Sequence, residues 1–529
     1  MAAGLHPLPH MSWNVRSHIR ERVSRERGTI HKVAPLRVAL TYPSPYHVGM
    51  SSLGFQTLYR LLNDHPQVVA ERAFLPDDLA AYQKTRLPLL TYESESVVGE
   101  FPVVALSVAY ELELGGVVDT LELAGIPPLS RDRNERHPLI LMGGPLTFSN
   151  PLPLGPFADV MILGEGEEPI LQLMDLMSGA GLSRQDLLKH LADIPGFYVP
   201  SLHGERLGPT ARAPAHLVPA RSVIVTPDTE LANMFLIEPE RGCSRGCTFC
   251  VMRRSTNGGM RLNDWEHVLS LIPDWVPRVG LVGAAVTDHP RHIDLVRAIV
   301  ESGKGIGVSS LRADKITAEF TTLLKAGGYR TMTVASDGAS ERIRGILRRQ
   351  IKEKHLLEAA RCVVETGLEG MKVYMMLGVP GETEADVDEL IGFTKELSKI
   401  VPITLGIAPF VPKRNTPLFD QPFTDIKITE ARLSRLDKAI RPRAKVKSTS
   451  ARWAWVEYRL AQGGWEAGLA ALQAHKAGGN FSDWKRAFKD LPVDPPWRRP
   501  DGDGAPLKMD RLDLEARAAI EASRAEVGA

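Results

Sequence analysis

The sequence predicts an α/β protein with a doubly wound parallel sheet, a partial (β/α)6 barrel and a small helical region at the carboxyl end. From residue 36 onward, short apolar runs alternate with longer mixed segments, the pattern of buried parallel strands joined by helices. A stretch rich in proline and glycine divides this alternation into two series. After the second series the chain is rich in tryptophan, alanine and charge, which we interpret as helical.

The length of 529 residues predicts more than one domain, because a single core rarely grows to this size. We expect five segments along the chain. They are a basic amino-terminal arm (1–34), a first α/β domain (35–200), a linker (201–231), a barrel domain (232–440) and a helical region with a tail (441–529).

Strand candidates in the first series are short and almost wholly apolar, as buried parallel strands are. They occupy residues 36–43, 102–110, 138–144 and 158–168, and helical stretches such as residues 52–64 follow them. In doubly wound sheets of this kind, ligands bind beyond the carboxyl ends of the strands. We therefore expect a binding edge at the ends of these four segments.

The second series supplies six strand candidates, separated by segments long enough for helices and crossovers. These are residues 234–243, 278–288, 305–312, 329–337, 370–381 and 402–412. Six such units predict a partial barrel and not a closed barrel of eight. Residues 451–476 then have the composition of helices.

Three of the four cysteines in the chain follow the first strand of the second series. Cys243, Cys247 and Cys250 have the spacing Cys-x3-Cys-x2-Cys, in a loop that also contains two glycines. Three thiolates can bind three corners of a cubane cluster and leave one iron open, whereas structural zinc normally takes four ligands. The spacing predicts an iron–sulfur cluster. The fourth cysteine, Cys362, is expected to be a buried hydrophobic side chain.

With Phe249 as the residue before the last cysteine, this motif resembles the signature of the radical S-adenosylmethionine (SAM) superfamily. The resemblance implies a [4Fe–4S] cluster whose open iron is chelated by the amino and carboxylate groups of SAM. Reductive cleavage of SAM then yields a 5′-deoxyadenosyl radical that abstracts hydrogen from a substrate. It also implies an external one-electron reductant of the flavodoxin or ferredoxin type.

The resemblance extends along the barrel over roughly residues 232–430, and it implies where SAM binds. The second strand ends in a turn that lacks the family's usual glutamate, so the backbone there takes the amino group. The third strand ends in polar residues for the ribose and carboxylate, and the exit of the fifth meets the adenine. The implied SAM residues are Phe249, Ala284, Ala285, Ser309, Ser310, Arg312 and Val379.

The first domain resembles the cobalamin-binding, Rossmann-like domain of one class of radical SAM enzymes, above all in residues 138–174, with Gly-Gly-Pro and Gly-Glu-Gly-Glu turns. It departs from classical cobalamin domains because it lacks the motif Asp-x-His-x-x-Gly, which places a histidine under cobalt. A corrinoid would lie flat over the strand ends. The implied cobalamin residues are Tyr42, Ser107, Gly143, Gly144, Gly164 and Glu165.

The function that follows is a cobalamin-dependent radical SAM enzyme, most simply a C-methyltransferase. One alternative is a radical SAM enzyme whose first domain binds no cobalamin and recognises substrate. A methylthiotransferase-like RNA modifier is disfavoured because it needs three more cysteines in the first domain, and no cysteine precedes Cys243. A non-catalytic iron–sulfur redox sensor would not need the SAM-binding motifs. No motif identifies the substrate.

Charge and hydropathy exclude other classes of partner. Lysine and arginine number 64 against 63 acidic residues, so no net field attracts nucleic acid. No apolar run approaches the length of a membrane span, and the first residues lack the apolar core of a secretory signal. We expect a cytoplasmic protein.

Overall fold

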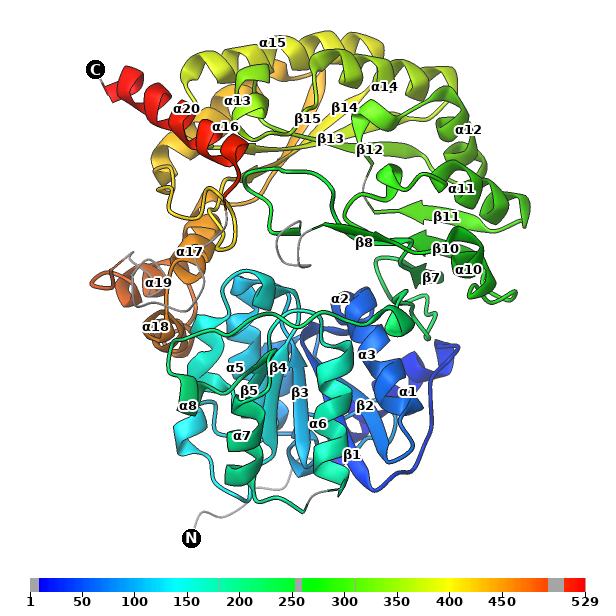
Figure 1. Cartoon of the computed structure of the whole chain (residues 1–529), viewed down its shortest axis with the longest axis vertical. Helices are drawn as coiled ribbons and strands as arrows, with labels where there is room; N and C mark the ends of the chain where they lie inside the picture. Colours follow the sequence, from blue (N-terminus) through cyan, green and yellow to red (C-terminus); the bar gives the residue numbers. More distant parts are fainter. Residues whose placement is uncertain (1–8, 180, 253–258, 310, 493–508, 529) are drawn as a thin grey trace. The chain divides into compact units, whose positions relative to one another are not determined.

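The computed structural model describes residues 9–179, 181–252, 259–309, 311–492 and 509–528. The chain divides into two compact units (Figure 1). The first unit comprises Met1–Leu236 and Gly463–Gly504, and the second comprises Ile237–Gln462 and Ala505–Ala529. The carboxyl-terminal region therefore contributes to both units, and each unit is described by itself.

A single six-stranded sheet forms the centre of the first unit. Its spatial order is β2 (Val68–Leu75), β1 (Leu36–Pro45), β3 (Val103–Ser107), β4 (Leu139–Gly143), β5 (Val160–Ile162) and β6 (Phe197–Tyr198). The first five strands are parallel, and β6 is antiparallel. The four predicted strands are confirmed. β2 escaped prediction because charged residues interrupt its apolar run, and β6 because it is only two residues long.

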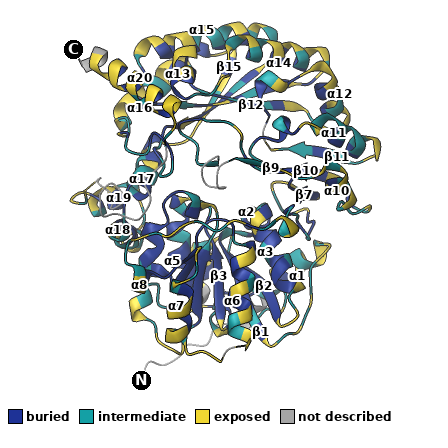
Figure 2. Ribbon diagram, in the orientation of Figure 1, coloured by how far each residue is buried: buried dark blue, intermediate teal, exposed yellow. Residues whose placement is uncertain are grey.

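Helices cover both faces of this sheet, which confirms the doubly wound prediction (Figure 1). The helices are α1 (Pro9–Arg25), α2 (Tyr46–Gly49), α3 (Leu53–Asp64), α4 (Leu79–Thr85), α5 (Leu114–Leu123), α6 (Glu167–Gly179), α7 (Arg184–Ala192), α8 (Pro200–His203), α18 (Trp465–Lys476) and α19 (Phe481–Ala487). Helices α3 and α6 contact each other over one face, and α5 packs with α18. The strands are buried, while the outer helix faces are exposed (Figure 2).

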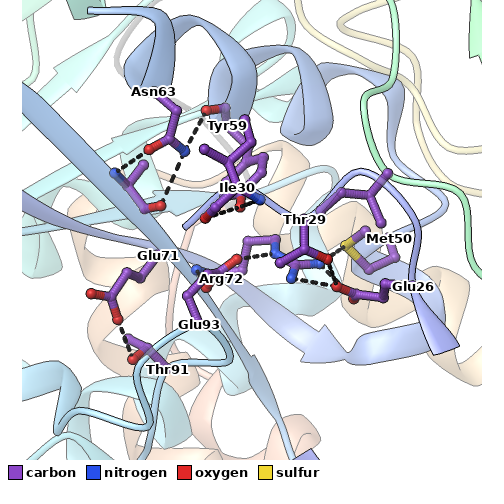
Figure 3. Close-up of polar contacts among 12 residues, drawn as sticks. Glu26, Thr29, Ile30, Met50, Tyr59, Asn63, Glu71, Arg72, Thr91 and Glu93 are labelled. Atoms are coloured by element: carbon purple, nitrogen blue, oxygen red, sulfur yellow. Dashed lines mark hydrogen bonds and ion pairs between the residues drawn. The ribbon is translucent and has the colours of Figure 1, made fainter. Parts of the chain in front are cut away.

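A buried ion triad joins the predicted arm to β2 (Figure 3). The guanidinium of Arg72 donates to both oxygens of Glu26 at 2.7 and 2.8 Å, and its Nε donates to Glu93 at 2.5 Å. Their side chains are 0%, 0% and 4% exposed. Burial raises the pKa of Glu93, whereas for Glu26 the attraction of Arg72 outweighs burial and lowers the pKa. The arm is thus anchored in the core at its end.

The segment expected to be a linker packs against the first unit over much of its length. Val225 bridges to Arg27, and Ala211 bridges to Gly164 at the carboxyl end of β5. Ile224 is only 1% exposed and belongs to the core of this unit. Residues 205–226 thus form a strap that lies against the sheet and helices of the first unit.

The second unit is the barrel, with strands that curve in the order β7 to β15 (Figure 1). The strands are β7 (Met234–Ile237), β10 (Arg278–Leu281), β11 (Gly305–Val308), β12 (Thr331–Asp337), β13 (Gly370–Leu377), β14 (Ile403–Pro409) and β15 (Ala444–Ser448). A parallel bridge between Leu311 and Val334 joins the β7–β11 group to the β12–β15 group. The six predicted strands are confirmed. The region expected to be helical nevertheless begins with β15, which pairs with β14 because its backbone completes that open edge.

An outer layer of helices surrounds these strands (Figure 1). The helices are α10 (Trp265–Ser270), α11 (His292–Glu301), α12 (Ala318–Ala326), α13 (Glu341–Ile346), α14 (Glu353–Glu365), α15 (Glu384–Ile400), α16 (Ile426–Ile440), α17 (Ala451–Ala461) and α20 (Arg511–Gly528). Helix α20 contacts α13, and Arg517 on α20 forms an ion pair with Asp420 at 2.6 Å. Among the described helices, none combines the length and the apolar character that a membrane crossing requires.

Candidate functional site

The cysteine loop lies between two short strands, β8 (Glu240–Gly242) and β9 (Met260–Leu262), which pair antiparallel. Gly242, at φ 86°, lets the chain turn from β8 into the loop. Thr248 fastens the loop to the end of α13: its amide donates to Leu347 at 3.1 Å and its hydroxyl to Ile346 at 3.2 Å. The three predicted thiols are thus held in one anchored loop. Arg253 and Arg254, which follow it, lie outside the described residues.

The thiols have the chemistry of a cluster site. Burial raises the pKa of Cys243 and raises that of Cys250 to about 11, so the uncharged thiols are favoured until a metal balances the thiolate charge. Among the described residues, no three His, Cys, Asp or Glu side chains converge as the ligands of a single ion do.

A hollow of about 150 Å³ opens beside Cys243, at the carboxyl ends of β10, β11 and β12. Four of the predicted SAM residues line it together with that cysteine: Ala284, Ala285, Ser309 and Arg312. Residues far apart in sequence therefore meet at the edge where a barrel carries its active site. Ser310 lies outside the described residues.

Among the residues that line this hollow, Arg312 is suited to bind a carboxylate group. Its side chain is 4% exposed, and Nη2 donates to Asp314 at 2.9 Å. Within the described parts of the chain, its Nη1 is buried without a hydrogen-bond partner. A buried guanidinium with an open donor can bind a carboxylate strongly, because little water competes there.

The turn after β10 is braced by a carboxylate that sequence reasoning missed. Glu240 is buried, and its Oε1 accepts the amide of Ala285 at 2.7 Å, while Oε2 has no partner among the described residues. A Cβ on Gly283 would lie 2.2 Å from that Oε1. Ser309 closes the turn from the other side, since its hydroxyl bonds both the amide and the carbonyl of Gly283. The available signal was a glutamate three residues before the first cysteine of the motif.

Burial raises the pKa of Glu240 to about 7, and the nearby Glu238 and Asp288 contribute. Asp288 itself is held by Arg245, with Nε–Oδ2 and Nη2–Oδ1 distances of 2.7 and 2.8 Å. Burial alone would raise the pKa of Asp288, but this guanidinium outweighs it and lowers the pKa. Arg245, from the cysteine loop, is thus fixed to the turn after β10.

Phe249 and Val379 lie outside the residues that line the hollow. Both belong to one apolar core that also contains Ile346, Phe410 and Ile520 of α20. Val379 as a whole is 2% exposed, and its side chain packs in this core. The aromatic residue of the motif anchors the cysteine loop through this core.

In the first unit, the predicted cobalamin residues lie at the carboxyl edge of the sheet, but several have partners within the protein. Gly144 has φ 102°, and a Cβ there would lie 2.7 Å from the backbone of Val108. At Gly164 a Cβ would lie 2.6 Å from Ala211 of the strap. These two glycines are therefore required by the chain itself. Gly143 differs, since a Cβ there meets no described atom nearer than 3.6 Å.

The polar residues of this edge are buried within the protein. Glu165 is 4% exposed and accepts the amide of Ala213 in the strap at 2.7 Å. Tyr42 is 4% exposed, packs edge-on against Phe55, and has its pKa raised by burial. Ser107 is 6% exposed. Among the six residues, Gly143 is the one whose surroundings leave room for a ligand.

Two family models match the chain. The model of radical SAM proteins, N-terminal, matches residues 54–200, and the model of the radical SAM superfamily matches residues 237–394. An uncharacterized protein of Methanocaldococcus jannaschii is 25% identical over 410 residues, which cover 76% of this chain and 81% of that protein. An uncharacterized methyltransferase of Pyrococcus horikoshii is 24% identical over 300 residues, covering 51% and 61%.

Solved structures share the fold. The radical SAM methyltransferase TsrM of Kitasatospora setae, with cobalamin and a [4Fe–4S] cluster bound, matches 75% of both chains with a TM-score of 0.52 at 16% identity. The same enzyme with tryptophan substrate and a SAM analogue matches with a TM-score of 0.51 at 16% identity, over 75% of this chain and 76% of that one. The chain belongs to the radical SAM superfamily, whose cofactors are a [4Fe–4S] cluster and SAM.

Proposed function

We propose that this protein is a cobalamin-dependent radical SAM methyltransferase that methylates a carbon atom of its substrate. The observation that carries the proposal is the tandem of a doubly wound sheet and a barrel with a cysteine loop. TsrM, whose structure holds cobalamin and a cluster, shares this fold over three quarters of both chains. The methyltransferase name of the Pyrococcus relative supports the same activity.

In this proposal the second unit holds the cluster and SAM. Cys243, Cys247 and Cys250 ligate three irons, and the buried Nη1 of Arg312 donates to the SAM carboxylate. The backbone of the turn at Ala284 and Ala285 faces the amino group. When bound, these groups supply a radical that removes hydrogen from an unreactive carbon.

The remaining assignments concern the residues that hold the SAM site in place, the source of the methyl group and the source of the electron. Ser309 keeps the turn after β10 closed through its two bonds to Gly283, and Phe249 and Val379 anchor the loop and the exit of β13 in one core. In the first unit, cobalamin supplies the methyl group and lies over the strand edge at Gly143. A flavodoxin or ferredoxin type of protein delivers the electron.

The experiment is anaerobic purification of the full chain, reconstitution with iron, sulfide and hydroxocobalamin, and a metal count with the absorption spectrum. The expected result is about four irons and one cobalt per chain. With a chemical one-electron reductant and SAM labelled in its methyl group, one SAM should transfer the label to the reduced corrinoid and leave S-adenosylhomocysteine. Reductive cleavage of a second SAM should yield 5′-deoxyadenosine and labelled methionine. Replacing all three cysteines of the loop by alanine should abolish the iron, while Cys362→Ala should keep it.

Cobalt binding is tested separately at Gly143. Gly143→Val adds a side chain where the edge is open, so it should lower bound cobalt at least tenfold and keep the iron. The matched control is Gly54→Val, since Gly54 on α3 has no described atom within 4 Å of a Cβ and lies away from the strand edge. Equal cobalt in both variants would place the corrinoid elsewhere.

A radical SAM enzyme without cobalamin is the second candidate. It is favoured by the internal partners of Gly144, Gly164 and Glu165, which explain these residues without any ligand. Iron without cobalt, together with SAM cleavage, would support it and make the first unit a module for substrate recognition.

A further inference from the structure

A charged pair lies directly behind the cysteine loop. The segment that links α13 to α14 contacts the loop at two successive residues: Thr248 bonds the carbonyls of Ile346 and Leu347, and Cys247 lies 4.0 Å from the carbonyl of Arg348. The next residue, Arg349, lines the same hollow as Cys243. One short segment thus supports the loop and brings a guanidinium to it.

Arg349 is held between an aspartate and a thiol. Its Nε lies 2.5 Å from Oδ2 of Asp337, at the end of β12, and its Nη2 donates to the carbonyl of Ala335 at 3.3 Å. The thiol of Cys247 is also close enough to the guanidinium to help raise the pKa of Arg349, after Asp337. The side chains of Arg349 and Asp337 are 13% and 16% exposed, so their charges are only weakly screened.

The backbone around this pair is held in an unusual conformation. Arg348, Gln350 and Asp337 all have left-handed φ values, of 53°, 59° and 63°. Residues with a Cβ rarely adopt this region, and such backbone persists only where the surroundings enforce it. The charged pair is therefore a fixed feature of the site and not a pair of mobile surface side chains.

A fixed charge near a cluster changes the energy of the electron that the cluster accepts. Hydrogen bonds to the sulfurs, net charge and solvent exposure set the reduction potential of iron–sulfur clusters. A cation stabilises the reduced form and an anion the oxidised form.

We propose that Arg349 and Asp337 set the reduction potential of the cluster, Arg349 raising it and Asp337 lowering it. The proposal rests on ligation of the cluster by the cysteine loop, as in the proposed function. Arg349 acts through the sulfur of Cys247, and Asp337 both orients the guanidinium and offsets part of its charge. The two residues together then match the cluster to its electron donor.

The test is a redox titration of the cluster, followed by electron paramagnetic resonance, on the reconstituted full chain without SAM at pH 8. Arg349→Gln should lower the ratio of reduced to oxidised cluster at least tenfold at a fixed potential, a shift of 59 mV for one electron. Asp337→Asn should move the same ratio in the opposite direction, by at least threefold. Arg349→Lys, which keeps the charge, should stay within threefold of the parent.

The matched controls remove the same charges at the carboxyl end of α16, where Asp437 on the helix and Arg441, the residue after it, form an ion pair at 2.7 Å. Arg441→Gln and Asp437→Asn should leave the titration unchanged. A purely structural role would shift Arg349→Gln and Asp337→Asn in the same direction or leave both unshifted, and either result overturns the proposal.

If Arg349→Gln fails to assemble a cluster, the upward shift in Asp337→Asn and the unchanged potential of Arg349→Lys still decide the question. Failure of the cluster ligation on which the proposal rests is distinguishable, because the parent chain would then assemble no four-iron cluster at all. Failure of the cobalamin-dependent activity alone would leave the cluster and its titration in place.

Discussion

Arg72→Met is expected to destabilise the first unit strongly at neutral pH. The substitution removes three charge-assisted hydrogen bonds to Glu26 and Glu93 and leaves both carboxylates in the core. Such bonds contribute about 1.5–3 kcal/mol each, but protonation of one carboxylate offsets part of the loss. We therefore expect a loss of about 3–5 kcal/mol, the usual cost of breaking a buried ion pair.

The pH dependence of this loss is a second signature of the triad. Without the guanidinium, both carboxyl groups have folded pKa values above their unfolded values. Their stabilising contribution is then present below the unfolded pKa and is lost as pH rises through the folded pKa. The deficit of Arg72→Met should shrink as pH falls from 7 to 5. The triple variant Glu26→Gln, Arg72→Met, Glu93→Gln should recover most of the stability at pH 7.

Hydrogen exchange followed by mass spectrometry on the β2 peptide is the suitable assay, because it reports the opening free energy of this unit alone. Arg37→Met is the matched control: Arg37 pairs with Glu71 beside the triad at 3.2 Å, but its side chain is 37% exposed. It should cost no more than about 1 kcal/mol. A loss below 1 kcal/mol in Arg72→Met, or an equal loss at pH 5 and 7, would refute the reasoning.

Three further outcomes are expected. Gly283→Ala places a Cβ against the carboxylate of Glu240 and should weaken SAM binding at least tenfold in calorimetry, with the cluster retained. The control Gly345→Ala, in open space on α13, should leave SAM binding unchanged. Unchanged binding in Gly283→Ala would contradict the assigned role of the turn. Burial raises the pKa of Glu382 to about 7, so its contribution to stability is lost as pH rises through 7. The stability of Glu382→Gln relative to the parent should therefore be higher at pH 8 than at pH 5 in hydrogen exchange of the second unit, and an equal difference at both pH values would contradict this. The hydrogen bond to Asp119 raises the pKa of His475. Its stabilisation of α18 is therefore present below the unfolded pKa of the histidine and is lost as pH rises through the folded pKa. His475→Gln should cost about 1 kcal/mol at pH 6 and less at pH 8, and an equal cost at both pH values would contradict this reasoning.

The features that could be predicted from the sequence are those whose signal is local. The three cysteines lie within eight residues, so their spacing alone predicts the cluster. The predicted strands are continuous apolar runs, because parallel strands are buried on both faces. Arg312 was predicted at the end of its strand by the family pattern, and the structure places it beside Cys243.

What only the tertiary structure decided depends on pairs that are distant in sequence. β2 contains Glu71 and Arg72, and its burial makes sense only once Glu26 and Glu93 are seen to balance the guanidinium. Gly164 suggested a cofactor surface, yet the strap 47 residues later lies against it.

The surroundings of the site follow the same rule. Glu240 braces a turn 45 residues away, and Asp337 forms an ion pair with Arg349, 12 residues later, at the hollow beside Cys243. The spacing of residues in the sequence predicts only which groups are neighbours on the same strand or loop. The electrostatic balance of a buried charge is set by whichever partner the fold brings to it, because the interaction depends on distance in space and on the exclusion of water.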